Sequence, residues 1–291
     1  MDQKNQPDCE NQLEEAGSRE NVPQNGTSET VKQPSEPPKQ EVTHNLKRSG
    51  GPVAAQTTTK RKKLFLYGNY DRYYGYRNNR EAPKEDARLP VFIEQRAFIE
   101  GKRMLDIGCN NGSLTLLIAE HCRPASVVGI DIDRNLIGAA RNNLALRRRT
   151  CDSNALKNVQ FRHINYVYAD EVLLECEKPQ YDVIFCLSVT KWIQLNFGDA
   201  GVKLAFRRAY RQLHPGGRFV LEPQPWDSYK HRRKLSPEIA ENFRAIQFRP
   251  DAFREYLLGD EVGFREVTEL KVPTSGGGSK GFRRPIYVFL K

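Results

Sequence analysis

The chain has 291 residues and a formal net charge of +10, from 46 Lys and Arg against 36 Asp and Glu. No apolar run reaches the roughly 18 residues needed to cross a bilayer, and the first residues lack an apolar signal core, so we expect neither a membrane-spanning segment nor a secretory signal. The six cysteines show no CxxC or Cys/His spacing, which disfavours a zinc site and favours reduced thiols inside the cell.

Residues 1–60 are rich in Glu, Gln, Ser, Pro and Asn and contain almost no aromatic residues. This composition cannot bury enough apolar surface to offset the entropy of ordering, so it predicts a disordered polar tail. Residues 1–59 hold 6 basic and 9 acidic side chains, which leaves 40 basic against 27 acidic in residues 60–291. A folded unit so basic favours a polyanionic partner, most often nucleic acid. The basic run at 60–63 is typical of either a nuclear-import signal or a flank that binds RNA.

Residues 67–78, YGNYDRYYGYRN, place five tyrosines in a stretch too polar for a core strand. Four of the rings recur at helical spacing, which fits one amphipathic turn packed on a core. The alternative is a cover whose rings stack on bases or cofactor, with nearby arginines binding phosphate. The residues alone leave both interpretations open.

From residue 103 onward, apolar runs alternate with amphipathic segments. Strands are expected at 103–108, 126–132, 159–164, 181–187 and 217–223, and helices at 113–122, 133–149 and 200–213. This alternation predicts an α/β fold, with right-handed crossovers in an open, mostly parallel, doubly wound sheet. Two last runs, at 263–272 and 284–291, are joined by a Gly/Ser-rich loop without a helix, which predicts an antiparallel hairpin at the C-terminal edge of the sheet.

The turn after the first expected strand reads D-I-G-C-N-N-G over residues 106–112. It departs from the dinucleotide pattern G-x-G-x-x-G because Asn110 stands at the second glycine, which weakens a dehydrogenase interpretation. S-adenosylmethionine needs less close an approach, and Asp131, at the end of the second strand, is the carboxylate expected to bind its ribose. Asp133 opens the following helix and is expected to be its N-cap. A methyltransferase is favoured over a dehydrogenase or a non-catalytic relative.

The fourth expected strand ends in C-L-S-V-T-K-W over residues 186–192. The acidic or amide residue followed by Pro-Pro-aromatic that holds planar amino groups is absent here, so the acceptor is not expected to be an exocyclic amine. Lys191 would suit an anionic acceptor, although a surface lysine beside a packing tryptophan fits equally well. We assign no catalytic role to Glu222.

The motifs YGNYDRYYGYRN, LDIGCNNGSLT, CLSVTKWIQLNFGD and LEPQPW, with SKGFRRPIY near the end, resemble those of the methylphosphate capping enzymes of the bicoid-interacting-protein-3 family. The resemblance runs from about Leu64 to Lys291, and members that act on 7SK RNA are the nearest in likeness. It implies a class I S-adenosylmethionine-dependent methyltransferase domain of Rossmann-like fold over residues 64–291. The implied reaction, of the EC 2.1.1 class, methylates the γ-phosphate of an RNA 5′-triphosphate, giving a monomethyl phosphate cap on a small nuclear RNA such as 7SK.

The resemblance also implies site residues. Those for the cofactor are Tyr67, Arg77, Gly108, Cys109, Asn110, Asp131, Ile132, Asn165, Tyr166 and Leu187. Those for the RNA are Asn69, Tyr70, Lys191, Trp192, Lys280 and Arg283, with Asn69, Tyr70 and Lys191 as the catalytic group. No metal is implied, and Cys109 has no nucleophilic role.

The implied setting is the nucleus, with a monomeric chain, no membrane, and a La-related RNA-binding protein as partner in a ribonucleoprotein. Two alternatives stay open: an RNA-binding scaffold that retains the fold, and a methyltransferase acting on protein or small molecules. The intact cofactor turn favours catalysis over the scaffold, and the basic surface favours RNA over the other acceptors.

Overall fold

The computed structural model describes residues 64–70, 86–150, 153–272 and 284–291, all within the unit Lys63–Lys291. The predicted polar tail, the basic run at 60–63 and most of the tyrosine-rich stretch lie outside these ranges.

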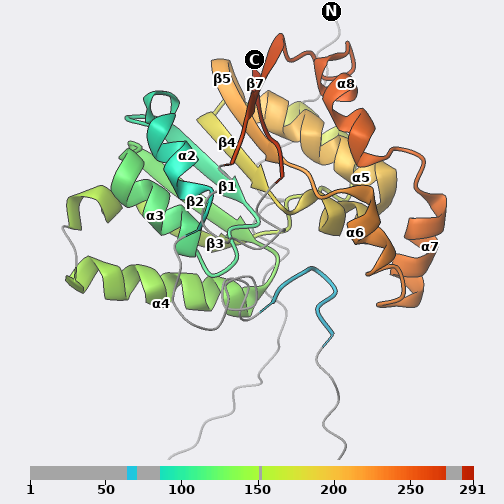
Figure 1. Cartoon of the computed structure of the whole chain (residues 1–291), viewed down its shortest axis with the longest axis horizontal. Helices are drawn as coiled ribbons and strands as arrows, with labels where there is room; N and C mark the ends of the chain where they lie inside the picture. The colour runs from blue at the N-terminus through green and yellow to red at the C-terminus, as the bar shows by residue number, and fades with distance from the viewer. Residues whose placement is uncertain (1–63, 71–85, 151–152, 273–283) are drawn as a thin grey trace, which may run out of the picture. The chain divides into compact units, whose positions relative to one another are not determined.

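Seven strands form one mixed sheet (Figure 1): β1 (Arg103–Ile107), β2 (Ser126–Asp131), β3 (Val159–His163), β4 (Tyr181–Leu187), β5 (Leu213–Glu222), β6 (Glu266–Leu270) and β7 (Ile286–Leu290). Their order across the sheet is β3-β2-β1-β4-β5-β7-β6. Strands β1 to β5 pair in parallel, whereas β7 pairs antiparallel with both β5 and β6. The predicted mostly parallel sheet with an antiparallel C-terminal hairpin is confirmed. Because the strand order reverses between β1 and β4, a ligand crevice is expected at their carboxyl ends.

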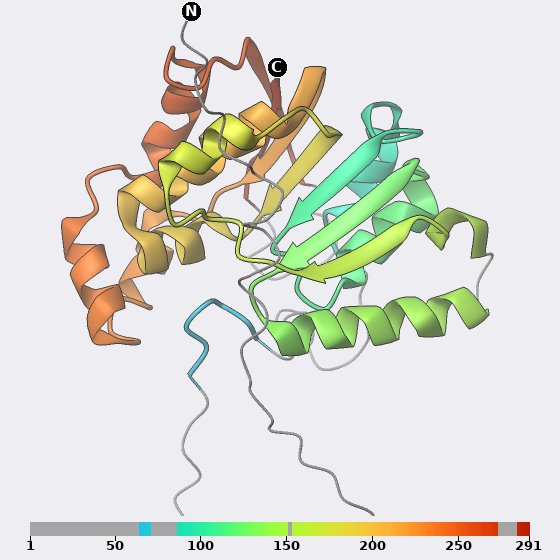
Figure 2. The same ribbon diagram turned by 180° about the vertical axis from the view of Figure 1, so that it is seen from behind.

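Helices cover both faces of the sheet (Figures 1 and 2). One face carries α2 (Leu89–Glu94), α3 (Ser113–Cys122) and α4 (Arg134–Thr150); the other carries α5 (Thr190–Gln212), α8 (Phe253–Leu258) and the 3₁₀ helix η4 (Glu171–Cys176). The remaining elements are α6 (Trp226–Lys230), α7 (Pro237–Ala245), and the short 3₁₀ helices η2 (Arg96–Phe98), η3 (Ser153–Leu156) and η5 (Pro250–Ala252). No helix in these ranges is long and apolar enough to cross a membrane.

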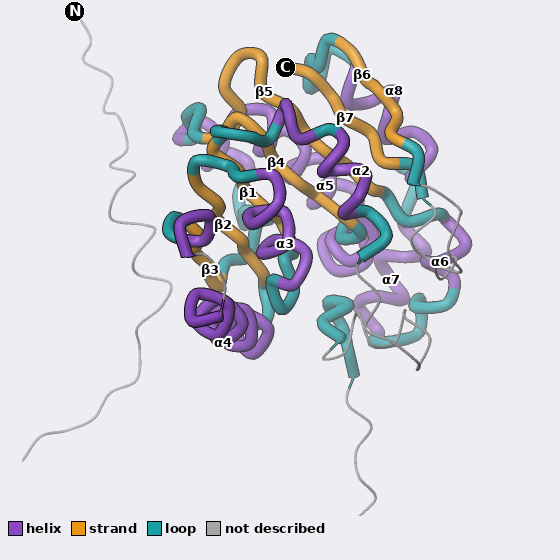
Figure 3. Tube along the Cα trace, turned by 60° about the vertical axis from the view of Figure 1, so that its left-hand side comes forward, coloured by secondary structure: helices purple, strands orange, loops and turns teal. Residues whose placement is uncertain are grey.

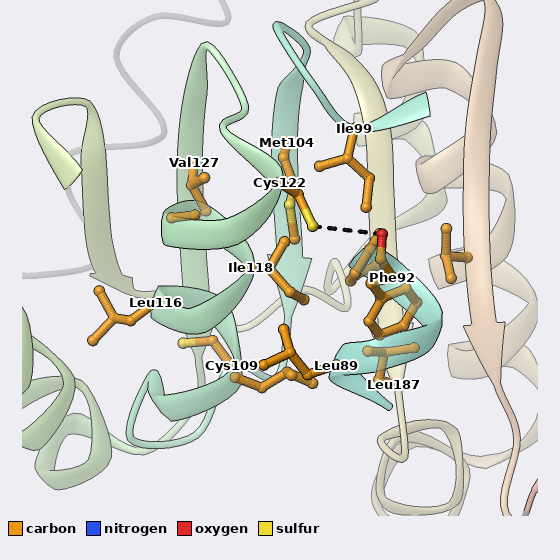
Figure 4. Close-up of a cluster of buried hydrophobic side chains, with 14 of the residues drawn as sticks. Leu89, Phe92, Ile99, Met104, Cys109, Leu116, Ile118, Cys122, Val127 and Leu187 are labelled. Atoms are coloured by element: carbon orange, nitrogen blue, oxygen red, sulfur yellow. Dashed lines mark hydrogen bonds between the residues drawn. The ribbon is translucent and has the colours of Figure 1, made fainter. Parts of the chain in front are cut away.

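Successive side chains of the buried strands point to opposite faces of the sheet and pack into two separate hydrophobic cores. On β4, Val183 and Phe185 pack with the α2–α3–α4 layer, while Ile184 and Cys186 pack with α5 and α8. Figure 4 shows the first of these cores, where Cys122 donates a hydrogen bond from Sγ to the Phe92 carbonyl at 3.5 Å. This contact ties α3 to α2 above β1.

The expected helix at 200–213 begins earlier than predicted, at Thr190, and is interrupted by Gly198 (φ 66°, ψ −168°). The Cα trace in Figure 3 shows α5 beside β4, and α6 and α7 pack against its N-terminal half, where Trp192 and Leu195 lie. Helices α2, α6, α7 and α8 were not predicted. These helices have five to nine residues, which is too short for a helical period to be recognised in the sequence.

The described cysteines differ in state. Cys109, Cys122 and Cys186 are free and buried, whereas Cys176 is disulfide-bonded. The expectation of uniformly reduced thiols is therefore wrong for Cys176.

Candidate functional site

A cavity opens at the carboxyl ends of β1, β2 and β4, the point where the strand order reverses. Residues that follow strands β1 to β4 line it. Residues 67–69, which precede β1 by more than thirty positions in the sequence, line it too. It brings together nine of the ten residues predicted for the cofactor: Tyr67, Gly108, Cys109, Asn110, Asp131, Ile132, Asn165, Tyr166 and Leu187. The tenth, Arg77, lies outside the described residues.

The floor of the cavity is the turn between β1 and α3. Gly108 (φ 75°) and Asn110 (φ 54°) both adopt the left-handed conformation, and the N–H groups of Gly108 and Cys109 bond to the Ile130 carbonyl at 2.8 and 2.9 Å. A Cβ at Gly108 would lie 2.7 Å from Val189 Cγ2, so only glycine fits there. Asparagine is one of the few residues with a side chain that tolerate the left-handed region, which explains how Asn110 can replace a glycine.

Asp131 is held rigidly at the end of β2. Its Oδ2 accepts a hydrogen bond from the Asn110 N–H at 3.0 Å, and its Oδ1 accepts one from the Asp133 N–H at 2.9 Å. Burial raises the pKa of this carboxyl above its ordinary value. A carboxylate has about four lone-pair sites, so both oxygens can still accept from a ligand hydroxyl in the cavity.

Asp133 caps α4, as predicted, because its Oδ1 accepts from the N–H groups of Asn135 and Leu136 at 2.7 and 3.1 Å. Its other oxygen, Oδ2, accepts a hydrogen bond from Asn69 Nδ2. Asn69 Oδ1 is buried with no partner among the described residues, and Asn69 lines the cavity. A buried acceptor of this kind costs free energy unless a donor arrives, which points to a ligand.

Asp106 also lines the cavity, but was not among the predicted site residues. Burial raises the pKa of its carboxyl to about 6, while the hydrogen bond from Thr115 Oγ1 at 2.5 Å opposes the rise. Asp106 is the first residue of the D-I-G-C-N-N-G turn, so its place in this motif is the sequence signal for it. The neighbouring Cys109 is buried, and the pKa of its thiol is raised well above the ordinary value, by burial first and by Asp106 and Asp131 next.

A buried ion-pair network borders the cavity. Arg88, 2% exposed, donates from Nη1 to Glu222 Oε2 at 2.7 Å and from Nη2 to Asp86 Oδ2 at 2.6 Å. Ser188 Oγ donates to the same Glu222 oxygen at 2.6 Å, and Arg284 Nη1 donates to Ser188 Oγ at 2.9 Å. The network thus joins the start of α2, the end of β5 and the C-terminal hairpin to Ser188, which lines the cavity.

The LEPQPW motif fixes the turn after β4. Ser188 has φ 60°, and its N–H donates to the Glu222 carbonyl at 3.0 Å. Gln224 accepts at Oε1 from Thr190 Oγ1 and the Lys191 N–H, both at 3.0 Å, and donates from Nε2 to the Ser188 carbonyl. Glu222 and Gln224 therefore hold the backbone that carries Lys191 and set its position.

Aromatic packing surrounds the residues predicted for RNA. Tyr70 packs edge-on against Trp192, with 6.0 Å between ring centroids, and Trp192 lines the cavity. Lys191 is only 8% exposed, with its Nζ 4.8 Å from the centroid of the Trp192 ring. The alternative prediction, that Lys191 is an exposed surface lysine, is therefore wrong. Its contact with the tryptophan ring is observed. Within the described ranges, Tyr70 and Lys191 flank the cavity and do not line it, while Lys280 and Arg283 lie outside those ranges.

The Gly68→Ala substitution is expected to displace residues 64–70 and to lower the free energy of unfolding by about 2–4 kcal/mol. Gly68 has φ 68°, and a Cβ there would lie 2.2 Å from atoms of the Trp192 ring. Gly101→Ala is the matched control, because Gly101 has φ 69° with nothing within 4 Å of a Cβ. Chemical denaturation measures both variants, and near-UV circular dichroism reports the tryptophan environment. Equal losses in the two variants would mean that the contact with Trp192 contributes nothing.

Comparison with known proteins adds to this geometry. The family model described as Bicoid-interacting protein 3 (Bin3) matches residues 181–291, and a methyltransferase domain model matches residues 105–219. The chain is 47% identical over 263 residues to the U6 snRNA methylphosphate capping enzyme Amus of Drosophila melanogaster, covering 90% of this chain and 85% of that protein. The human 7SK snRNA methylphosphate capping enzyme is 39% identical, with 82% of this chain matching 41% of that protein. A probable RNA methyltransferase of Arabidopsis thaliana is 38% identical, with 80% of this chain matching 82% of that protein.

Proposed function

The chain belongs to the Bin3 family of methylphosphate capping enzymes, and on this premise we propose that it transfers the methyl group of S-adenosylmethionine to the γ-phosphate of a small nuclear RNA 5′-triphosphate. The observation that supports this most directly is one cavity with a cofactor-type cradle, made by Asp131 and the Gly108 turn, that is lined on another side by Val189 and Trp192. U6 and 7SK RNAs, on which the two named relatives act, are the candidate substrates.

The residues present fit S-adenosylmethionine. Asp131 offers free lone pairs for ribose hydroxyls, and Gly108 lets a ligand lie against the backbone. Asp106 places a buried carboxyl where an ammonium group could bind, and the unpartnered Asn69 Oδ1 awaits a donor. Ile132, Ile164 and Leu187 supply apolar walls for an adenine ring. When bound, the cofactor supplies an electrophilic methyl carbon.

A terminal phosphate oxygen is ionised near neutral pH, so the chain need not provide a general base. Its task is to align that oxygen with the methyl carbon and to neutralise the other phosphate oxygens. We assign this task to Lys191, Trp192, Tyr70 and Asn69. Lys191 is suited to it because Gln224 fixes its backbone and its Nζ lies 4.8 Å from the centroid of Trp192, which lines the cavity. Arg77, Lys280 and Arg283 keep their assignments from the resemblance.

Transfer of labelled methyl groups from S-adenosylmethionine to matched RNAs with triphosphate, monophosphate or hydroxyl 5′ ends tests the proposal. We expect label only on triphosphate RNA, and its loss with the γ-phosphate after pyrophosphatase treatment. Equal labelling of all three RNAs would instead indicate methylation of a base or ribose. Binding of triphosphate RNA without any transfer would favour the RNA-binding scaffold.

Cofactor affinity is expected to fall by about tenfold per pH unit below about pH 6. Burial raises the pKa of Asp106 to about 6 and also raises that of Asp131, so both carboxyls take up protons on acidification. A cationic ligand favours the ionised carboxylate, and therefore its binding releases a proton and weakens as the pH falls. Calorimetry in buffers of different ionisation enthalpy measures both effects. Asp106→Asn should remove most of the dependence; an unchanged pH profile in that variant would exclude Asp106.

The small nuclear RNA substrate also implies action in the nucleus. A La-related RNA-binding protein as partner and a monomeric chain are part of the same proposal. Co-purification with the RNA before and after ribonuclease treatment distinguishes a protein contact from one bridged by RNA.

A further inference from the structure

A basic segment, residues 230–234 (K-H-R-R-K), joins α6 to α7 and plays no part in the site described above. Lys230, Arg233 and Lys234 are exposed and Arg232 is half-buried. Lys230 pairs with Asp227 at 2.8 Å, but in the described part of the chain no ion pair joins Arg232, Arg233 or Lys234 to a carboxylate. Three cationic side chains are therefore free of carboxylate partners in these ranges.

Aromatic rings lie under the arginines of this region. Trp226 and Phe243 stack with centroids 5.2 Å apart and an interplanar angle of 8°. The Arg249 guanidinium lies 5.1 Å from the centroid of Trp226, and that of Arg233 lies 5.8 Å from the centroid of Phe243. A guanidinium that rests on a ring keeps its N–H edge available for bidentate bonds to phosphate oxygens.

The same surface continues to the acceptor side of the cavity. The Arg232 guanidinium lies 5.5 Å from the centroid of Tyr70, and Tyr70 packs on Trp192. Trp192 also belongs to one apolar cluster with Leu66 and with residues of α6 and α7. Helices α6 and α7 lie next to each other in Figures 1 and 3. An RNA whose 5′ end reached Trp192 would leave the cavity beside the basic segment.

We infer that Arg232, Arg233, Lys234 and Arg249 form a docking surface for the sugar–phosphate backbone of the RNA that follows the methylated 5′ end. The inference rests on the proposed function, because it takes its direction from the acceptor side of the cavity. Unpaired cations, stacked arginines and contact with Tyr70 all suit a chain of phosphates. The affinity that this surface provides increases with the length of the RNA and does not depend on the identity of its bases.

The test compares the Arg233→Ala, Lys234→Ala double variant with the wild type on two substrates, a 5′-triphosphate dinucleotide and a 20-nucleotide RNA of the same 5′ sequence. We expect the double variant to bind the long RNA about tenfold more weakly at about 0.15 M salt, with a slope of log affinity against log salt smaller by about 1.4, or roughly 0.7 per phosphate contact. The KM for the dinucleotide and the affinity for S-adenosylmethionine should not change. Lys157→Ala with Lys178→Ala is the matched control, since it removes two exposed charges elsewhere and should not affect either substrate.

Unchanged affinity for the long RNA in the double variant would overturn the inference, and would leave an acidic protein as the partner of this surface. An equal loss for both substrates would overturn it too, because the residues would then act on the triphosphate or on folding. If the wild type methylates no triphosphate RNA but the double variant still loses affinity and salt slope with the long RNA, the proposed function fails while the docking surface stands.

Discussion

Asp131→Ala is expected to weaken S-adenosylmethionine binding by at least about 100-fold, because two hydrogen bonds to a charged acceptor contribute about 1.5–3 kcal/mol each. The loss of its carboxylate also frees the Asn110 and Asp133 N–H groups that shape the cavity floor. Calorimetric titration with the cofactor measures the change.

Asp170→Ala is the matched control for this variant. Asp170 also accepts a backbone N–H, that of Val172 at 2.9 Å, but it caps η4 and does not line the cavity. We expect cofactor affinity within about twofold of wild type in the control. Binding in Asp131→Ala within about threefold of wild type would exclude Asp131 from the cofactor site, whatever the effect on stability.

Arg88→Met is expected to lower the free energy of unfolding by about 3–5 kcal/mol, since it leaves the carboxylates of Asp86 and Glu222 buried without their shared cation. Glu222→Gln should cost less, because the amide oxygen can still accept from Arg88 and Ser188. The double variant should lose less than the sum of the two single losses, which denaturant unfolding measures as a coupling energy.

The control for the buried network is Arg207→Ala, which breaks the ion pair with Glu171, a carboxylate that is 60% exposed. An exposed pair of this kind contributes at most about 1 kcal/mol. Strictly additive losses in Arg88→Met and Glu222→Gln would show that these two residues do not stabilise each other.

The sequence predicted the strands well because each is a run of apolar residues bounded by turn residues, a pattern that local chemistry enforces. The positions of Asp131 and of the turn at Gly108 beside the cavity were predictable too, since each follows directly from the end of a strand. The pairing of Arg88 with Glu222 joins residues 134 positions apart, and no local pattern marks it. The left-handed Ser188 is likewise held by tertiary contacts, because its N–H and carbonyl bond to Glu222 and Gln224. Short helices such as α2 form because they pack on the core, and six residues alone would not be helical.

Four consecutive residues, 67–70, touch both sides of the cavity. Asn69 bonds to Asp133 beside the cofactor cradle, and the next residue, Tyr70, packs on Trp192 on the acceptor side. A ligand that stabilises this segment on one side also stabilises its contacts on the other side, so we expect the two ligands to bind cooperatively. By thermodynamic linkage, the factor by which the cofactor tightens RNA binding equals the factor by which RNA tightens cofactor binding. We therefore expect the cofactor and the RNA to be coupled through residues 67–70, which contact both sides of the cavity.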